Sequence, residues 1–128
     1  MNISGIHHAA IIASDYPRSR RFYTEVLGLE IVAEVYRAQR DSYKLDLRLP
    51  DGAQIELFSF PSPPPRVSRP EACGLRHLAF SVPDLEAAVQ SLRHHGIEPE
   101  PVRVDEYTGK KFTFFADPDD LPLELYEA

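Results

Sequence analysis

The amino-acid sequence predicts an α+β protein made of two tandem βαβββ modules. The chain has 128 residues, the length of one ordinary domain or of two halves that share a core. Two repeated signals divide it. His8 stands seven positions before Asp15, and His77 stands seven positions before Asp84. The strings PDGAQIELF at 50–58 and PDDLPLELY at 118–126 then give each half a similar final turn and strand.

The first module is predicted from its apolar patterns and its turn residues. A run of apolar and β-branched residues before Asp15 is typical of a buried strand, and the segment after it ends at Gly28, a common helix stop. The sequence Asp51-Gly52 then marks a hairpin turn. We expect a strand, a helix and three further strands, in this order: Ile6–Ala13, Tyr16–Leu27, Glu30–Ala38, Ser42–Leu49 and Ala53–Phe60.

The second module repeats this order. Its helix should begin after Pro83-Asp84 and end at Gly96, because apolar residues recur there at steps of three and four. Asp120 takes the place of the turn glycine, and Asp tolerates such backbone better than most residues. The expected strands are Leu75–Val82, Glu100–Asp105, Lys111–Ala116 and Leu121–Glu127. The whole chain, 1–128, is thus expected to be one domain, with module one at 5–60, a proline-rich linker at 61–71 and module two at 72–128.

The composition excludes several classes of function. The chain carries 14 basic and 20 acidic residues, for a net charge of −6, and no basic block, so binding to nucleic acid or to an acidic membrane is disfavoured. The first residues lack the pattern of a secretory signal, and no apolar run approaches a membrane span, so we expect a cytoplasmic protein. Cys73 is the single cysteine, which leaves histidines and carboxylates as the candidate ligands of any metal ion.

Strand alternation selects the candidate site residues. His77 shares a face with Ala79 and Ser81, while the bulkier Leu78 and Phe80 belong to the other face, where a helix would cover them. His77 therefore should point away from the helix layer. The same register in module one selects His8, rather than its neighbour His7, as the matching side chain.

Each module also places one glutamate between two leucine or isoleucine residues of its last strand. Glu56 and Glu124 would be costly to bury without a partner, so such a carboxylate is normally paired or bound to metal, although a single one could simply face solvent. A pseudo-twofold axis would bring His8, His77 and both glutamates to one centre. Such a set of nitrogen and oxygen ligands suits Zn, Ni, Mn, Co or Fe(II) without selecting one of them.

Three stretches of the chain resemble the vicinal oxygen chelate superfamily, which includes glyoxalase I, bleomycin-resistance proteins, extradiol dioxygenases, methylmalonyl-CoA epimerase and fosfomycin-resistance enzymes. They are HHAAIIASDYPRSRRFYTEVLGLE, RHLAFSVPDLEAAVQSL and FTFFADPDDLPLELYEA. The resemblance implies an incomplete eight-stranded, barrel-like sheet with His8, Glu56, His77 and Glu124 as metal ligands. It also implies a homodimer, in which the site is built either within one chain or from halves exchanged between two chains.

The same resemblance implies a function. We expect a glyoxalase-type lyase or isomerase that depends on a divalent metal ion, acts on a small substrate with adjacent oxygens through a metal-stabilised enediolate, and uses Glu124 as its catalytic base. Ile12 and Phe60 stand where bacterial glyoxalase I usually has the Arg and Asn that contact glutathione, which argues against glutathione specificity. The alternatives are a non-catalytic small-molecule-binding or resistance protein and an extradiol-type dioxygenase. Anion contacts could come from Lys44, Lys110 or Lys111.

Overall fold

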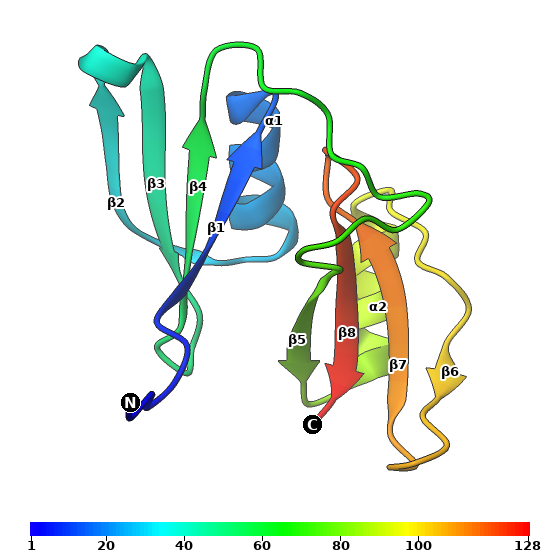
Figure 1. Cartoon of the computed structure of the whole chain (residues 1–128). Helices are drawn as coiled ribbons and strands as arrows, with labels where there is room; N and C mark the ends of the chain where they lie inside the picture. Colours follow the sequence, from blue (N-terminus) through cyan, green and yellow to red (C-terminus); the bar gives the residue numbers. More distant parts are fainter. The chain divides into compact units, whose positions relative to one another are not determined.

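The chain folds into two units of similar design, residues 1–65 and 66–128 (Figure 1), in a computed structural model that describes all residues from 1 to 128. Each unit contains a four-stranded sheet and a helix, with the order strand, helix, three strands along the chain. The predicted α+β class and the two tandem βαβββ modules are therefore confirmed. No helix is long and apolar enough to cross a membrane.

In the first unit, the first and last strands lie side by side and run parallel. The strands are ordered β1-β4-β3-β2, and the other two neighbouring pairs are antiparallel. Figure 1 shows the helix on one face of this sheet. The elements are β1 (His8–Ala13), α1 (Tyr16–Arg21), β2 (Glu30–Arg37), β3 (Ser42–Arg48) and β4 (Gln54–Ser59).

Helix α1 has a clear start and an irregular end. The side chain of Asp15 accepts a hydrogen bond from the backbone N–H of Arg18, 3.1 Å away, and caps the helix. The helix then continues as one π-helical turn, Phe22–Val26, and the chain leaves it at Gly28 with a φ of +71°. The predicted helix over 16–27 is thus present, but its second half is wider than an α-helix, because its backbone bonds skip one more residue.

The second unit has the same topology, with strand order β5-β8-β7-β6 and β5 parallel to β8. Asp120 has a φ of +63°, so it occupies the left-handed position that the sequence assigned to it. The elements are β5 (Leu78–Val82), α2 (Leu85–His94), β6 (Arg103–Val104), β7 (Lys111–Ala116) and β8 (Pro122–Glu127). A capping bond from the Ala87 N–H to the Asp84 carboxylate, 3.0 Å long, begins α2.

The expected strand over 100–105 is much shorter in the structure. Only Arg103 and Val104 pair with β7. The residues on both sides of Glu100 are prolines, which have no N–H to donate to a sheet. Glu100 itself still donates its backbone N–H to the carbonyl of Phe114, at 2.9 Å. The segment therefore follows the edge of the sheet without forming a regular ladder.

The core of each unit lies between its helix and the helix-facing side of its sheet. Leu45, Leu47 and Leu57 are fully buried in unit one, and Leu85 and Leu123 are fully buried in unit two. The opposite face of each sheet has no helix over it, and this open face carries the predicted site residues. The hydrophobic core thus holds the sheets in place while one face of each stays free for chemistry.

Truncating a core side chain should destabilise the protein strongly. Leu57→Ala removes a side chain with no exposed surface, so we expect a loss of about 2–5 kcal/mol in the free energy of unfolding. Urea denaturation of the variant and of the parent measures this loss. Leu75 is half exposed, so Leu75→Ala is the matched control and should cost less than about 1 kcal/mol. Equal effects of the two changes would contradict this assignment of the core.

A cluster of three polar side chains, Tyr16, Arg20 and Glu34, links α1 to β2 through hydrogen bonds. Arg20 donates two hydrogen bonds to the carboxylate of Glu34, at 2.8 and 3.0 Å, and the Tyr16 hydroxyl donates a third. The hydrogen bonds from Arg20 lower the pKa of the Glu34 carboxyl group most, and the bond from Tyr16 lowers it further. Burial, together with the neighbouring Glu34 carboxylate, raises the pKa of Tyr16.

This cluster predicts an acid-dependent part of the stability. A carboxyl group whose pKa is lowered by folding stabilises the protein above its unfolded pKa, and this contribution disappears as the pH falls through the folded pKa. The stability of the parent should therefore fall below about pH 4.5 more steeply than that of Glu34→Gln. Urea denaturation at a series of pH values between neutral and pH 3 makes the comparison. Identical pH profiles would show that the cluster contributes nothing.

Candidate metal centre

The open face of the first sheet brings His8 and Glu56 together. The parallel pairing of β1 and β4 places Ala10 opposite Glu56, and His8, two residues before Ala10, lies on the same face. The Nε2 atom of His8 is 3.6 Å from Oε1 of Glu56. The Glu56 side chain is 15% exposed, so its carboxylate is held mostly out of water.

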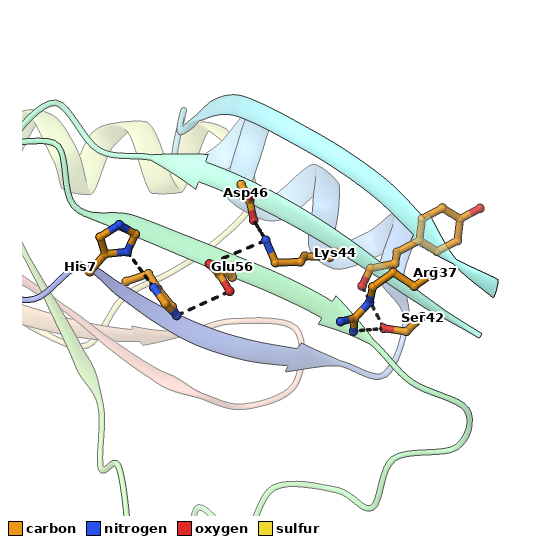
Figure 2. A network of polar contacts seen from close by, with 8 residues as sticks. His7, Arg37, Ser42, Lys44, Asp46 and Glu56 are labelled. Carbon is orange, nitrogen blue, oxygen red and sulfur yellow. Dashed lines mark hydrogen bonds and ion pairs between the residues drawn. The ribbon is translucent and has the colours of Figure 1, made fainter. Parts of the chain in front are cut away.

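Two charged side chains of β3 complete this part of the site. Asp46 lies opposite Glu56 in the antiparallel pairing of β3 and β4. Figure 2 shows the Lys44 ammonium between the two carboxylates, with Nζ 2.7 Å from Asp46 Oδ1 and 3.8 Å from Glu56 Oε2. Glu56 thus lies between an imidazole and an ammonium group.

The second sheet brings His77 and Glu124 together in the same way. His77 directly precedes β5, and its Nε2 atom is 3.0 Å from Oε2 of Glu124. The Glu124 side chain is 12% exposed. The residue opposite Glu124 on β7 is Phe114, whose ring meets the His77 ring edge-on, with centroids 5.0 Å apart. This half of the site is therefore lined by an aromatic ring where the first half has Asp46.

The residue before each histidine contacts its Nδ1 atom. In the second unit, Arg76 donates to Nδ1 of His77 at 3.0 Å. Because an arginine only donates, Nε2 of His77 could bind a metal ion only after Arg76 releases Nδ1 and the ring proton moves to Nδ1. In the first unit, Nδ1 of His7 lies 2.9 Å from Nδ1 of His8. A histidine ring nitrogen can accept a hydrogen bond as well as donate one. Nδ1 of His7 can therefore accept a hydrogen bond from Nδ1–H of His8, which leaves Nε2 of His8 free to bind a metal ion.

Each His–Glu pair, taken by itself, suits a divalent metal ion. Ligands at about 2.1 Å from one ion lie about 3.0–3.5 Å apart when they are adjacent in its coordination sphere. The two observed N···O distances, 3.0 and 3.6 Å, are close to this spacing. Imidazole nitrogen and carboxylate oxygen also form the donor set expected from the sequence. Within neither unit does a third His, Cys, Asp or Glu join the pair in a position to hold a metal ion.

Other candidate residues are placed differently. Of the three lysines named as anion contacts, only Lys44 lies at a His–Glu pair, because Lys110 bonds to the carbonyl of Ala128 and Lys111 to Glu86. Ile12 is exposed opposite Phe58, and Phe58 stacks with Phe60. The first unit thus presents an apolar surface beside its pair.

Sequence reasoning missed Asp46, Arg76 and Phe114. The alternation of Leu45 and Leu47 with polar residues already places Asp46 on the open face. The strand pairing that sets Asp46 opposite Glu56 and Phe114 opposite Glu124 is known only from the folded sheets.

The chain is thus a small protein with a duplicated βαβββ fold and a His–Glu pair on the open face of each sheet. The nitrogen and oxygen donors of such pairs suit metal-dependent chemistry. The family model of the Glyoxalase/Bleomycin resistance protein/Dioxygenase superfamily matches residues 5–125 of the chain. The chain belongs to this superfamily.

Curated relatives are similar over nearly the full length. The chain is 61% identical to the uncharacterized protein YwkD of Bacillus subtilis and 60% identical to the uncharacterized protein YaeR of Escherichia coli, with at least 98% of each chain covered. It is also 30% identical to a 2-epi-5-epi-valiolone epimerase from Actinomyces sp., over 94% of this chain and 77% of the relative. The chain is thus recognisably similar in sequence to an epimerase.

Solved structures share the fold. The crystal structure of SMU.1112c matches with a TM-score of 0.94 and 49% identity, covering 98% of this chain and 100% of that one. A glyoxalase family protein from Enterococcus faecalis matches with a TM-score of 0.91 and 50% identity, covering 99% and 100%. The fosfomycin resistance protein FosX from Listeria monocytogenes has the same fold at 20% identity and a TM-score of 0.75, covering 98% and 93%, and one of its variants was crystallised with Mn(II).

Proposed function

We propose that the protein is a divalent-metal-dependent lyase or isomerase of the glyoxalase type, in which His8, Glu56, His77 and Glu124 hold one metal ion. The observation that carries this proposal is the repeated pair: each unit sets a mostly buried carboxylate against an imidazole on the open face of its sheet. One such pair would be ordinary. The same pair in both halves of a duplicated fold favours a shared role.

The two glutamates have surroundings that suit different tasks. The Lys44 ammonium forms an ion pair with Glu56 at 3.8 Å, and this contact restrains the side chain, which suits a fixed ligand. Glu124 faces Phe114 and His77 and has no Lys or Arg within 4.0 Å. We therefore assign Glu124 to the transfer of a carbon-bound proton, the task of a general base.

The substrate in this proposal is a small molecule with two adjacent oxygens. A bound divalent ion supplies Lewis-acid chemistry, because it stabilises the negative charge that develops on such oxygens when a neighbouring proton is removed. Glu124 accepts that proton and returns it to the same or to the neighbouring carbon. Ile12 and Phe60 stand where bacterial glyoxalase I usually has the Arg and Asn that contact glutathione, so we propose a smaller substrate than the glutathione adduct. The superfamily resemblance further supports a homodimer.

Exchange of a carbon-bound proton with solvent tests the function even while the product is unidentified. The protein is incubated in D₂O with Zn, Ni, Mn or Co and with a panel of α-hydroxy and α-keto carbonyl compounds, and deuterium incorporation is followed by NMR. We expect metal-dependent exchange with at least one compound, and its loss on addition of a chelator. Tight binding of a panel compound without any exchange would instead support a non-catalytic binding protein, and oxygen-dependent ring cleavage of a catechol would support a dioxygenase.

A further inference from the structure

The second unit contains a hollow beside its His–Glu pair. It has a volume of about 360 Å³ and lies between the second half of the proline-rich linker with the residues that follow it, the loop after α2 and the adjoining ends of β7 and β8. Four arginines line it: Arg66, Arg69, Arg76 and Arg103. Its wall also includes Phe114, which contacts His77. The hollow therefore adjoins the residues assigned to chemistry.

The four arginines differ in whether a carboxylate neutralises them. Arg66 uses its guanidinium to bond Ser68 and the carbonyls of Leu75 and Arg76, which shapes the wall. Arg103 forms an ion pair with Glu100 at 3.3 Å. Arg76, by contrast, has no carboxylate within 4.0 Å, although it does donate to Nδ1 of His77.

The acidic residues in the wall do not neutralise Arg76. Glu98 is held by Arg93 in a bidentate contact, and Glu100 is held by Arg103. Glu71 and Asp120 also line the hollow, but neither forms an ion pair with one of its arginines. Arg76 thus presents a full positive charge to a concave site, and a guanidinium binds a planar or tetrahedral oxyanion through paired N–H groups.

Two arginines approach the same aromatic ring. The guanidinium carbons of Arg76 and Arg103 lie 6.0 and 5.8 Å from the centroid of Phe114. The same ring contacts His77, whose ring centroid is 5.0 Å away. The cationic groups are therefore separated from the His77–Glu124 pair by a single side chain, a distance that one small molecule can span.

We propose that this hollow binds the anionic group of the substrate, a carboxylate or a phosphate, through Arg76 and Arg103. The inference rests on the proposed function, because it takes the reacting oxygens to lie at the His77–Glu124 pair. It narrows the substrate to a small acid or phosphate ester that carries two adjacent oxygens a few bonds from its anionic group. Arg76 acts here as a specificity-determining residue, since it selects charged substrates over neutral ones.

Binding of simple anions tests this inference directly. The full-length protein is titrated separately with inorganic phosphate and with acetate, and the side-chain Nε–Hε signals of its arginines are followed by NMR. We expect saturable shifts of Arg76 and Arg103 with the anion type that the substrate carries, and no shift of Arg20, whose Nε is held by Glu34. Shifts with phosphate alone indicate a phosphate ester, shifts with acetate alone indicate a carboxylic acid, and shifts with both anions support a site that takes either group.

Variants of Arg76 complete the test. Arg76→Met should weaken binding of the active anion at least about tenfold, Arg76→Lys should recover part of the loss, and Arg18→Met, on the exposed surface of α1, should leave it unchanged. The absence of saturable binding of either anion, or an equal affinity in Arg76→Met, would overturn the inference.

Metal analysis of the same samples separates this inference from the proposed function. Anion binding that depends on Arg76 in a protein that takes up no metal would leave the hollow as an anion site and refute the metal-dependent function. A protein that binds metal and catalyses exchange, but binds neither anion, would refute the anion site alone.

Discussion

Replacing His77 by Ala should lower the affinity of the protein for a divalent ion by at least about 100-fold, because losing even an outer partner of a metal ligand commonly costs 10–100-fold. His77 contributes the nitrogen that lies 3.0 Å from Glu124. His8→Ala should have an effect of similar size if both pairs serve one ion. Competition with a chromophoric chelator, using Zn and Mn in separate titrations, measures the affinity of each variant.

The control for these variants is another exposed histidine of the second unit. His94 lies in the last turn of α2 and is exposed. His94→Ala should bind metal as the parent does. An equal loss of affinity in His94→Ala, or none in His77→Ala, would show that the metal is held elsewhere.

Replacing Glu124 by Gln should lower the rate of proton exchange by about 10²–10⁴-fold, the contribution typical of a general base. The amide keeps the shape of the side chain and an oxygen that can contact metal, but it cannot take a proton. We therefore expect the variant to retain its metal ion while losing exchange. Metal content and deuterium incorporation, measured on the same preparation, separate the two roles of this residue.

Glu86 provides the comparison for Glu124. It lies at the start of α2 and pairs with Lys111 on the surface, and this contact lowers its pKa. Glu86→Gln should leave both metal content and exchange unchanged. If Glu124→Gln exchanges protons at the parental rate, the base is another group, and Glu56 is the first candidate because it occupies the equivalent place in the first unit.

Much of the fold could be predicted from the sequence because its signals are local. The capping residues Asp15 and Asp84 each accept the hydrogen bond that begins a helix. Alternation along each strand also placed His8 and His77 on the faces away from the helices, and the structure sets each of them against a glutamate. Such patterns depend on residues that are close in sequence, where backbone geometry alone decides the outcome.

What could not be predicted depends on contacts between distant segments. Arg66 donates hydrogen bonds to the carbonyls of Leu75 and Arg76 and so shapes the hollow, and no local sequence pattern predicts these bonds. The flanking prolines that shorten β6 are visible in the sequence, but the expectation that the second module repeats the first suggested a longer strand there. The bonds of Arg66 thus depend on packing between separate segments, whereas the short β6 follows from the local chemistry of proline.

The two units share a fold but differ in the chemistry of their open faces. The residues opposite the glutamates are Asp46 in the first unit and Phe114 in the second. Asp46 and Lys44 therefore lie beside Glu56, whereas an aromatic ring lies beside Glu124. Arginines approach aromatic rings in both units. The difference between the two glutamates fits the proposal that Glu124, rather than Glu56, transfers the proton.

The central claim is that two His–Glu pairs serve one divalent ion, and the metal content of unsupplemented protein tests it most directly. Plasma mass spectrometry should find one divalent ion per chain in the parent, and a loss of nearly all of it in both His8→Ala and His77→Ala. Two ions per chain with each variant losing only one, or a parent that retains no ion after titration with Zn, Ni, Mn and Co, would contradict it.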